Sequence, residues 1–415
     1  MITQEQIELI TEILINRVEK LNTKILKEIG KNIKKIGTLK ATDVMRLSAI
    51  IKYGGSYETI LEELAKTTEL NRKDIEKIFR EVSKKDYEFA NKFYKYREID
   101  RIPFEQNVML QNQINSIAMS TIEEYVKQTT MLGYGLVDDD GKVIFNGIRD
   151  AFNDLVDDAI LSVSQGKETY REVMYRQLKE MGSGGLRVIY PTTYIGKDGK
   201  EHHYTRRLDS VLRTTIQDGL RTLHNENQKV FGQEFGADGY EISVHSNPAI
   251  DHEEVQGRQF SIEEYEKLNM GLEAKDYKGK TYTLDHNDDG NIRPIGELNC
   301  YHYIFPIILG VSDPEYTDKE LNQIIEDNNK GFEFDGKHYT NYEGTQLQRQ
   351  LETKIREQKD AQILAKESGQ DDLVRDAQKN ITDLTRKYKE LSQASGLPTK
   401  MQRLRVSGYK RTKTK

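Results

Sequence analysis

The chain has 415 residues and a formal net charge of −6, and 36% of its residues are hydrophobic while 31% are charged. This length allows two to four domains with cores of their own, and the high charge favours a helix-rich protein with much solvated surface. The negative net charge argues against a protein that coats DNA over its whole surface. The single cysteine excludes an intramolecular disulfide, which fits assembly in a reducing compartment.

The first hundred residues predict a small helical module. Thr3 and Gln6 form a capping-box pattern, and apolar residues follow at helical spacing: Ile7, Ile10, Leu14, Val18, Leu21 and Ile25. After Gly37, the stretches 41–55, 56–70 and 71–85 predict three shorter helices, the last two capped by Ser56 and Asn71. Three short helices also occur in helix-turn-helix DNA readers. The last stretch mixes basic and acidic residues, however, so we favour docking on protein over phosphate binding.

Helices and hairpins alternate between residues 101 and 200. We expect helices over 103–128 and 147–164, a hairpin over 136–145 and a strand over 186–190. The acids at 138–140 suggest a cation site, but the glycine after them makes a tight turn the better explanation. The glycines within 182–185 are followed by a predicted strand instead of a Lys-Ser/Thr pair, which excludes a P-loop.

A helix is predicted over 206–231. Its apolar stripe is opposed by a polar side that carries Arg206, Arg213, Gln217 and Arg221. This arginine stripe is either a solvated face, which we favour, or a surface for a phosphate backbone or a neighbouring subunit.

The segment 285–297 matches the first half of a calcium loop, but Gly296 stands where a bidentate Glu is required. We therefore favour an acidic turn that contains His286. Further on, Asp335-Gly336 predicts a hairpin turn, and two long helices from Tyr342 are separated at Ser368-Gly369. Residues 400–415 hold seven basic groups and no acid, which predicts a mobile tail with candidate DNA-binding residues: Arg403, Arg405, Lys410, Arg411, Lys413 and Lys415.

The stretch from Tyr240 to Gly310 collects polar residues that no packing pattern requires. His245 ends a predicted strand, and Cys300 and His302 lie two apart in a second one, so both would project from one face. Together with His252, these thiolate and imidazole donors suit a closed tetrahedral zinc site. Their spacing departs from the usual zinc-binding clips, so the alternative is a set of hydrogen-bonded histidines around a buried thiol.

The same stretch carries a family resemblance. HSNPAIDHEEVQGRQFS followed by ELNCYHYIFPIILG resembles the signature of the phage minor capsid protein 2 family, which is related to the Mu F-like head morphogenesis proteins. Asp251 and Asn299 lie within these motifs. RRLDSVLRTTIQDGLR resembles the family's helix with an Arg-Thr pair, Arg213 and Thr214 here, and YEGTQLQRQLETKIREQKDAQ its Gln-Arg helix, with Tyr342, Gln348, Arg349 and Arg356. Tyr301 departs from the basic residue that relatives often carry between the Cys and the His.

We therefore expect a predominantly helical α+β protein in four parts. These are an N-terminal helical docking module (1–100), helices and hairpins leading into the core (101–200), a central mixed α/β domain with short antiparallel strands (201–340), and a C-terminal helical hairpin with a basic tail (341–415).

The resemblance implies a minor capsid protein of the phage virion that associates with the portal or major capsid protein during head assembly, with packaged DNA and homo-oligomer contacts as further options. Zinc is the one cofactor that the sequence suggests, as an option and not as a requirement. No export signal or membrane span is expected. Alternatives are a metal-dependent toxin or hydrolase carried in the virion, which would use the Cys-His cluster, and a cytoplasmic DNA-binding protein. An enzyme is not favoured, because Cys300 lies in an apolar, aromatic run.

Overall fold

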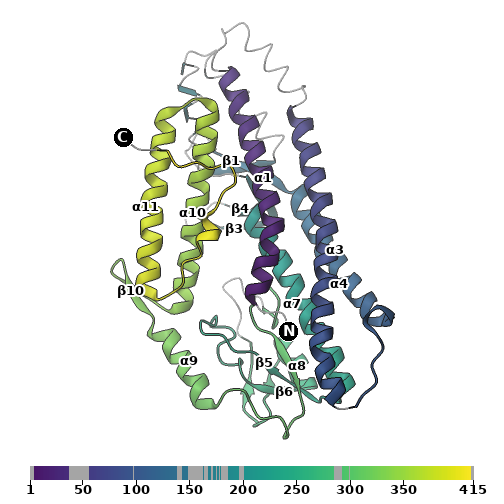
Figure 1. Cartoon of the computed structure of the whole chain (residues 1–415). Helices are drawn as coiled ribbons and strands as arrows, with labels where there is room; N and C mark the ends of the chain where they lie inside the picture. The colour runs from purple at the N-terminus through teal and green to yellow at the C-terminus, as the bar shows by residue number, and fades with distance from the viewer. Residues whose placement is uncertain are drawn as a thin grey trace. The chain divides into compact units, whose positions relative to one another are not determined.

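The computed structural model describes residues 4–36, 56–96, 98–137, 143–147, 186–195, 201–284, 292–298 and 300–412, together with a few positions between 162 and 178 (Figure 1). In these residues the fold is predominantly helical α+β, which confirms the predicted class, and its strands form small antiparallel sheets. The chain divides into two compact units. Unit 1 comprises residues 1–12, 72–124 and 213–346, and unit 2 comprises 13–71, 125–212 and 347–415. The four-part division made from the sequence stays a prediction.

The longest helices of unit 1 come from α3 (Ser56–Tyr96), α4 (Val108–Thr130) and α7 (Leu208–Phe235), with the short η1 (Phe104–Gln106) before α4. Gly219 on α7 permits their close approach, because a Cβ there would lie 2.3 Å from the hydroxyl of Thr121 on α4 and 2.9 Å from Phe79 on α3. A buried hydrogen bond of 2.8 Å between His224 Nδ1 and Asp86 Oδ2 joins α7 to α3.

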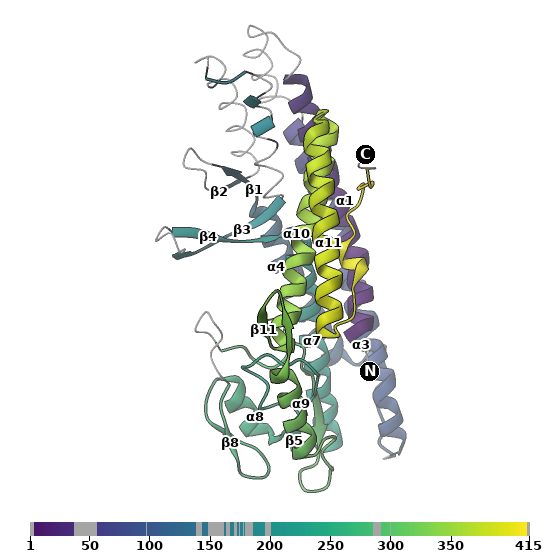
Figure 2. The ribbon, with the colours of Figure 1, turned by 90° about the vertical axis from the view of Figure 1, so that its left-hand side faces the viewer.

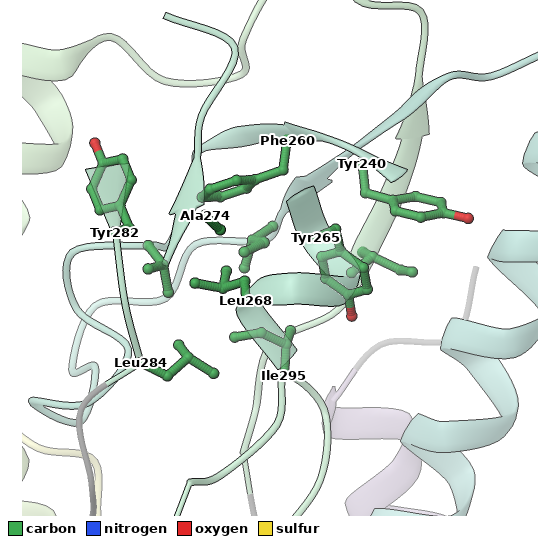
Figure 3. Packing of buried hydrophobic residues seen from close by; sticks show 11 residues of the cluster. Tyr240, Phe260, Tyr265, Leu268, Ala274, Tyr282, Leu284 and Ile295 are labelled. Atoms are coloured by element: carbon green, nitrogen blue, oxygen red, sulfur yellow. The ribbon is translucent and has the colours of Figure 1, made fainter. Parts of the chain in front are cut away.

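A three-stranded sheet forms the second layer of unit 1. β5 (Gly239–Ile242) lies between β6 (Gln259–Ser261) and β9 (Ile304–Ile307) and pairs antiparallel with both. The Ser261 side chain accepts a hydrogen bond from the Glu264 N–H and so caps α8 (Ile262–Asn269). Figure 3 shows Phe260, Tyr265 and Leu268 meeting in one buried cluster with residues from β7 (Ala274–Lys275) and β8 (Thr281–Tyr282). This core holds the ends of β5 and β9 in place.

Local sequence rules account for the rest of unit 1. Thr317 and Glu320 form a capping box at the start of α9 (Asp318–Lys330). The hairpin of β10 (Phe332–Phe334) and β11 (Lys337–Tyr339) turns at Asp335 and Gly336, whose φ angles are 50° and 72°. Positive φ at both positions favours an Asp-Gly pair, so the predicted turn is confirmed.

Unit 2 contains most of α1 (Gln4–Ile36) and a four-stranded antiparallel sheet in the order β2-β1-β3-β4. The strands are β1 (Leu132–Val137), β2 (Val143–Gly147), β3 (Leu186–Ile195) and β4 (Glu201–Arg207), and Figure 2 shows β3 and β4 as an extended hairpin. The predicted helical hairpin is confirmed. α10 (Asn341–Ser368) and α11 (Asp371–Ser395) are antiparallel, with Gln348 bonded to Ser392 at one end and Gln362 to Gln378 toward the other, and η2 (Met401–Leu404) follows.

Several expectations about the elements change or go untested. α3 runs unbroken through Asn71, so the predicted break and cap there are wrong. Asn71 is fully buried and donates a hydrogen bond of 2.9 Å to the Tyr125 hydroxyl, so its polar group is satisfied by the core and does not end the helix. The stretches 41–55, 138–141, 182–185, 196–199 and 285–290, and most of 147–164, lie outside the described residues.

Candidate functional site

The predicted Cys-His cluster lies at one end of the β5–β9 pair in unit 1. Because the two strands are antiparallel, the chain that leaves β5 runs beside the chain that enters β9. The Ser243 N–H donates to the Tyr303 carbonyl and the Tyr303 N–H to the Ser243 hydroxyl, both at 2.8 Å. The expected strand around Cys300 and His302 is wrong, since β9 begins only at Ile304. The two side chains meet because the non-strand backbone before β9 curls around the sulfur.

His252 reaches this place through a run of turns between β5 and β6. The Gly257 N–H donates to the Ile242 carbonyl at 2.8 Å, and Gly257 has a φ of 70°. A Cβ at Gly257 would lie 2.5 Å from Leu321, so both the backbone angle and the packing require glycine there. The turn run folds back against the end of β5, which brings His252 to Cys300.

Three side chains of the cluster present their donor atoms to one another. Cys300 Sγ lies 3.2 Å from His252 Nδ1 and 3.3 Å from His302 Nδ1. The ligand atoms of these three residues all lie within 4.8 Å of one another. The exposed fraction is 2% for Cys300 and 1% for each histidine. Such an arrangement has the donor types and closeness of a buried metal site.

His245, the fourth residue of the predicted site, lies beside this group. Its ring centroid is 4.4 Å from that of His302, and the two rings are inclined by 33°. The set of converging ligand atoms consists of His252, Cys300 and His302 without it. The structure therefore brings three of the four predicted ligands together and places His245 against the ring of one of them.

Burial keeps every member of the cluster neutral in the metal-free protein. Loss of hydration lowers the pKa of His252 and of His245 to about 4 each, and lowers the pKa of His302 well below its ordinary value. Burial also raises the pKa of the Cys300 thiol, although backbone N–H groups and nearby arginines oppose this. A nucleophile would need a lowered thiol pKa, so the metal-free cluster does not resemble an activated cysteine.

Two residues that the sequence analysis did not single out orient the histidines. His252 Nε2 is 2.7 Å from the Arg293 carbonyl, and His302 Nε2 is 3.3 Å from Gln256 Oε1. Arg293 is held in turn by Asp251, which accepts from Arg293 Nε at 2.8 Å and Nη2 at 2.5 Å. The resemblance had marked Asp251 without a role. Gln256 follows His252 by four positions in a turn run, which no helix or strand pattern would have paired.

The expectation of a solvated arginine stripe on one helix is wrong, because Arg206 lies on β4 and the other three members, on α7, are mostly buried. Arg221 is fully buried and Gln217 almost so. The guanidinium of Arg221 donates to Asp218 Oδ1 at 2.8 Å and lies 4.4 Å from the ring centroid of Tyr301. Arg213 forms an ion pair of 2.5 Å with Glu12 and is largely buried. This side of α7 therefore supplies internal contacts of unit 1, and Tyr301 provides an aromatic face for Arg221.

The remaining family-motif residues have structural partners within the units. Gln348 is buried and donates to Ser392 and to the Pro398 carbonyl, and Arg356 lies 3.1 Å from Asp209 in an ion pair. The Tyr342 N–H donates to Asn328 at 3.0 Å. Thr214 and Arg349 are half-buried, whereas Asn299 lies outside the described residues.

The basic tail is packed for most of its length, so the expectation of mobility is wrong for residues up to 412. Leu404 and Val406 are buried, and the Ser407 carbonyl accepts a hydrogen bond from the Thr23 hydroxyl at 2.6 Å. Arg403 is buried with its guanidinium 3.9 Å from Glu352. Arg405, Lys410 and Arg411 are exposed, while Lys413 and Lys415 lie outside the described residues.

A match to the family model of phage minor capsid protein 2 covers residues 2–392. The chain belongs to this family. It is thus a phage minor capsid protein and a virion component, and the resemblance, whose quoted motifs begin at Arg206, extends to the N-terminal helices. No curated protein and no solved structure matches the chain. Among the described residues, no helix combines the length and apolar character needed to cross a membrane.

Proposed function

We propose that this minor capsid protein joins the phage head beside the portal, on the inner side of the shell, and remains there with the packaged DNA. The observation that carries this proposal is the family match over residues 2–392, which includes the helices as well as the sheet that bears the cluster. A protein of a minor capsid family needs surfaces for a few assembly partners more than it needs a substrate cavity. The long helices and the closed cluster agree with such a structural role.

The burial of the cluster argues against the alternative of a metal-dependent toxin or hydrolase. A hydrolytic metal centre keeps one coordination position open to substrate and water. Cys300, His252 and His302 are each at most 2% exposed, which leaves a substrate little access to them. No structural observation favours this second function, so the structural role is the better supported one.

The location can be tested on purified virions. We expect the chain to be present in density-gradient-purified particles, to resist protease while the capsid is intact, and to be digested once the head is opened. The portal protein and the major capsid protein should each be co-expressed with the full-length chain in turn, and we expect stable co-elution with the portal protein. Absence from virions would contradict the proposal, as would digestion of the chain in intact particles.

The proposed DNA contact is confined to the exposed part of the tail. Arg405, Lys410 and Arg411 are exposed, whereas Arg403 points its charge at Glu352 inside unit 2. Replacing the three exposed residues with Gln should weaken DNA binding and reduce the slope of log affinity against log salt by about 3, at roughly 0.9 per phosphate contact. A matched control replaces three exposed lysines of α3, Lys84, Lys85 and Lys92, with Gln. Equal losses in both variants would leave only a general charge effect.

A further inference from the structure

We propose that Cys300 Sγ and the Nδ1 atoms of His252 and His302 bind one zinc ion, which cross-links the turn run after β5 to the segment before β9. This metal site belongs to unit 1 and is independent of where the protein sits in the virion. Its three donor atoms lie within 4.8 Å of one another in a buried place.

Hydrogen bonding determines the tautomer of each histidine. In both rings the nitrogen that faces the sulfur is the unprotonated one. The Arg293 carbonyl can only accept, so His252 Nε2 carries a proton and His252 Nδ1 has a free lone pair. Gln256 Oε1 accepts a hydrogen bond of 3.1 Å from the backbone N–H of His245, which identifies this atom as the amide oxygen. His302 Nε2 must therefore donate to it, and His302 Nδ1 also has a free lone pair.

In this arrangement the cluster has fewer protons than acceptor atoms. The Cys300 thiol carries one proton and can donate it to only one of the two Nδ1 atoms. The other imidazole then presents a lone pair to the sulfur in a buried environment, which is unfavourable. Gln256 accepts a hydrogen bond from His302 through its amide oxygen, although the buried Nε2 of the same amide has no partner among the described residues. A cation at the centre would be bound by all three lone pairs at once.

The distances also suit zinc. With Zn–S of about 2.3 Å and Zn–N of about 2.0 Å, tetrahedral angles separate the sulfur and nitrogen ligands by about 3.5 Å. The observed separations from Sγ to the two Nδ1 atoms are 3.2 and 3.3 Å. One sulfur and two imidazoles form a borderline-soft donor set that zinc accepts and that magnesium or calcium does not. Binding would displace the thiol proton and yield the thiolate ligand.

The surroundings supply the support that metal ligands need. Metal-bound histidines usually donate their other ring N–H to a carbonyl or carboxylate, as His252 does to Arg293 and His302 does to Gln256. The backbone N–H of His302 donates to Cys300 Sγ at 3.4 Å, which suits a sulfur that carries negative charge. The fourth position is left to water or to His245, and burial keeps either arrangement closed to a substrate.

The test is the metal content of the full-length protein, made without a histidine tag in zinc-containing medium and measured by elemental analysis. We expect about one zinc per chain, lost in Cys300→Ser and in His302→Ala. The matched control is His224→Ala, which removes a buried histidine bonded to Asp86 outside the cluster and should keep the zinc. If the variants fold poorly, wild-type protein stripped by a chelator and refilled with cobalt(II) should show a sulfur-to-metal absorption band. Zinc-free wild type that also fails to take up cobalt would overturn the proposal, as would a Cys300→Ser variant that keeps its zinc.

Discussion

The two units each bury a polar cluster, but the clusters balance their charges in different ways. In unit 2, Arg207 contacts Asp209 at 3.0 Å and Asp360 at 2.7 Å, and Arg356 contacts the other oxygen of Asp209 at 3.1 Å. Two arginines thus face two carboxylates; burial lowers the pKa of Arg207, but the two acids outweigh it and raise the pKa above its ordinary value. In unit 1, Cys300 and two neutral histidines bring three acceptors and a single proton together.

This difference is the one expected between a structural ion network and the proposed zinc site. In the unit 2 network each buried carboxylate is matched by an arginine, so the network carries no unbalanced charge. In the unit 1 cluster three acceptors share one proton, and the proposed zinc ion would supply the positive charge that balances them. Burial alone therefore does not distinguish the two, whereas counting protons and charges does.

The largest effect is expected from breaking the unit 2 network. Arg207→Met leaves Asp209 and Asp360 buried without their main partner, and loss of one partner from a buried ion pair costs about 3–5 kcal/mol. Urea unfolding monitored by circular dichroism would measure this loss in the free energy of unfolding. The control Arg386→Met removes an arginine that is 67% exposed in its pairs with Asp383 and Glu390 and should cost about 0.5 kcal/mol or less. Zinc content should stay unchanged in both variants, and equal destabilisation would contradict the ranking.

Zinc removal is expected to have the next largest effect and to act only through the unit 1 cluster. A ligand present at about 100 times its dissociation constant stabilises the folded state by about 3 kcal/mol. Stripping zinc with a chelator should therefore lower the thermal midpoint of the 415-residue wild type by about 3–4 °C. Chelator should leave the midpoint of Cys300→Ser where it was. A chelator effect of the same size in that variant would place the stabilising metal elsewhere.

The sequence was informative where chemistry is local. The Asp335-Gly336 turn and the helical hairpin around Gly369 follow from propensity and spacing, and the structure has them. The cluster could be proposed because Cys and His in a short polar stretch are unusual without a role. Its strand geometry could not be predicted correctly, since the pairing of β5 with β9 decides where the strand begins.

Long-range polar pairing was out of reach of the sequence. Arg207 and Asp360 are separated by 153 positions, and each is unremarkable in its own helix or strand pattern. Arg221 appeared to belong to a solvated face, because a helical pattern places it opposite the apolar stripe. Only the packing of Tyr301 against it shows that this face is internal. Polar residues thus predict a surface unless a tertiary partner is known.

A smaller effect is expected from loosening the support of the cluster. Asp251→Asn removes the negative charge that holds Arg293, whose carbonyl orients His252. Changes at such supporting residues weaken metal binding by about tenfold or more, and competition with a chelating dye would measure the zinc affinity. The control Asp318→Asn affects an exposed carboxylate that pairs with Arg258 and Lys278 away from the cluster. Unchanged affinity in Asp251→Asn would show that Arg293 is positioned without it.

The smallest effect is expected at His245 and decides how the fourth position is filled. If its ring only packs against His302, then His245→Ala loses an aromatic contact of about 0.5–1.5 kcal/mol and zinc affinity falls about threefold. His245→Phe keeps the contact but cannot coordinate zinc, so it should restore the affinity. A loss of tenfold or more in both variants would instead identify His245 as the fourth ligand. In that case zinc binding turns the His245 ring away from its tilted position beside His302, and the protein alone supplies all four ligands.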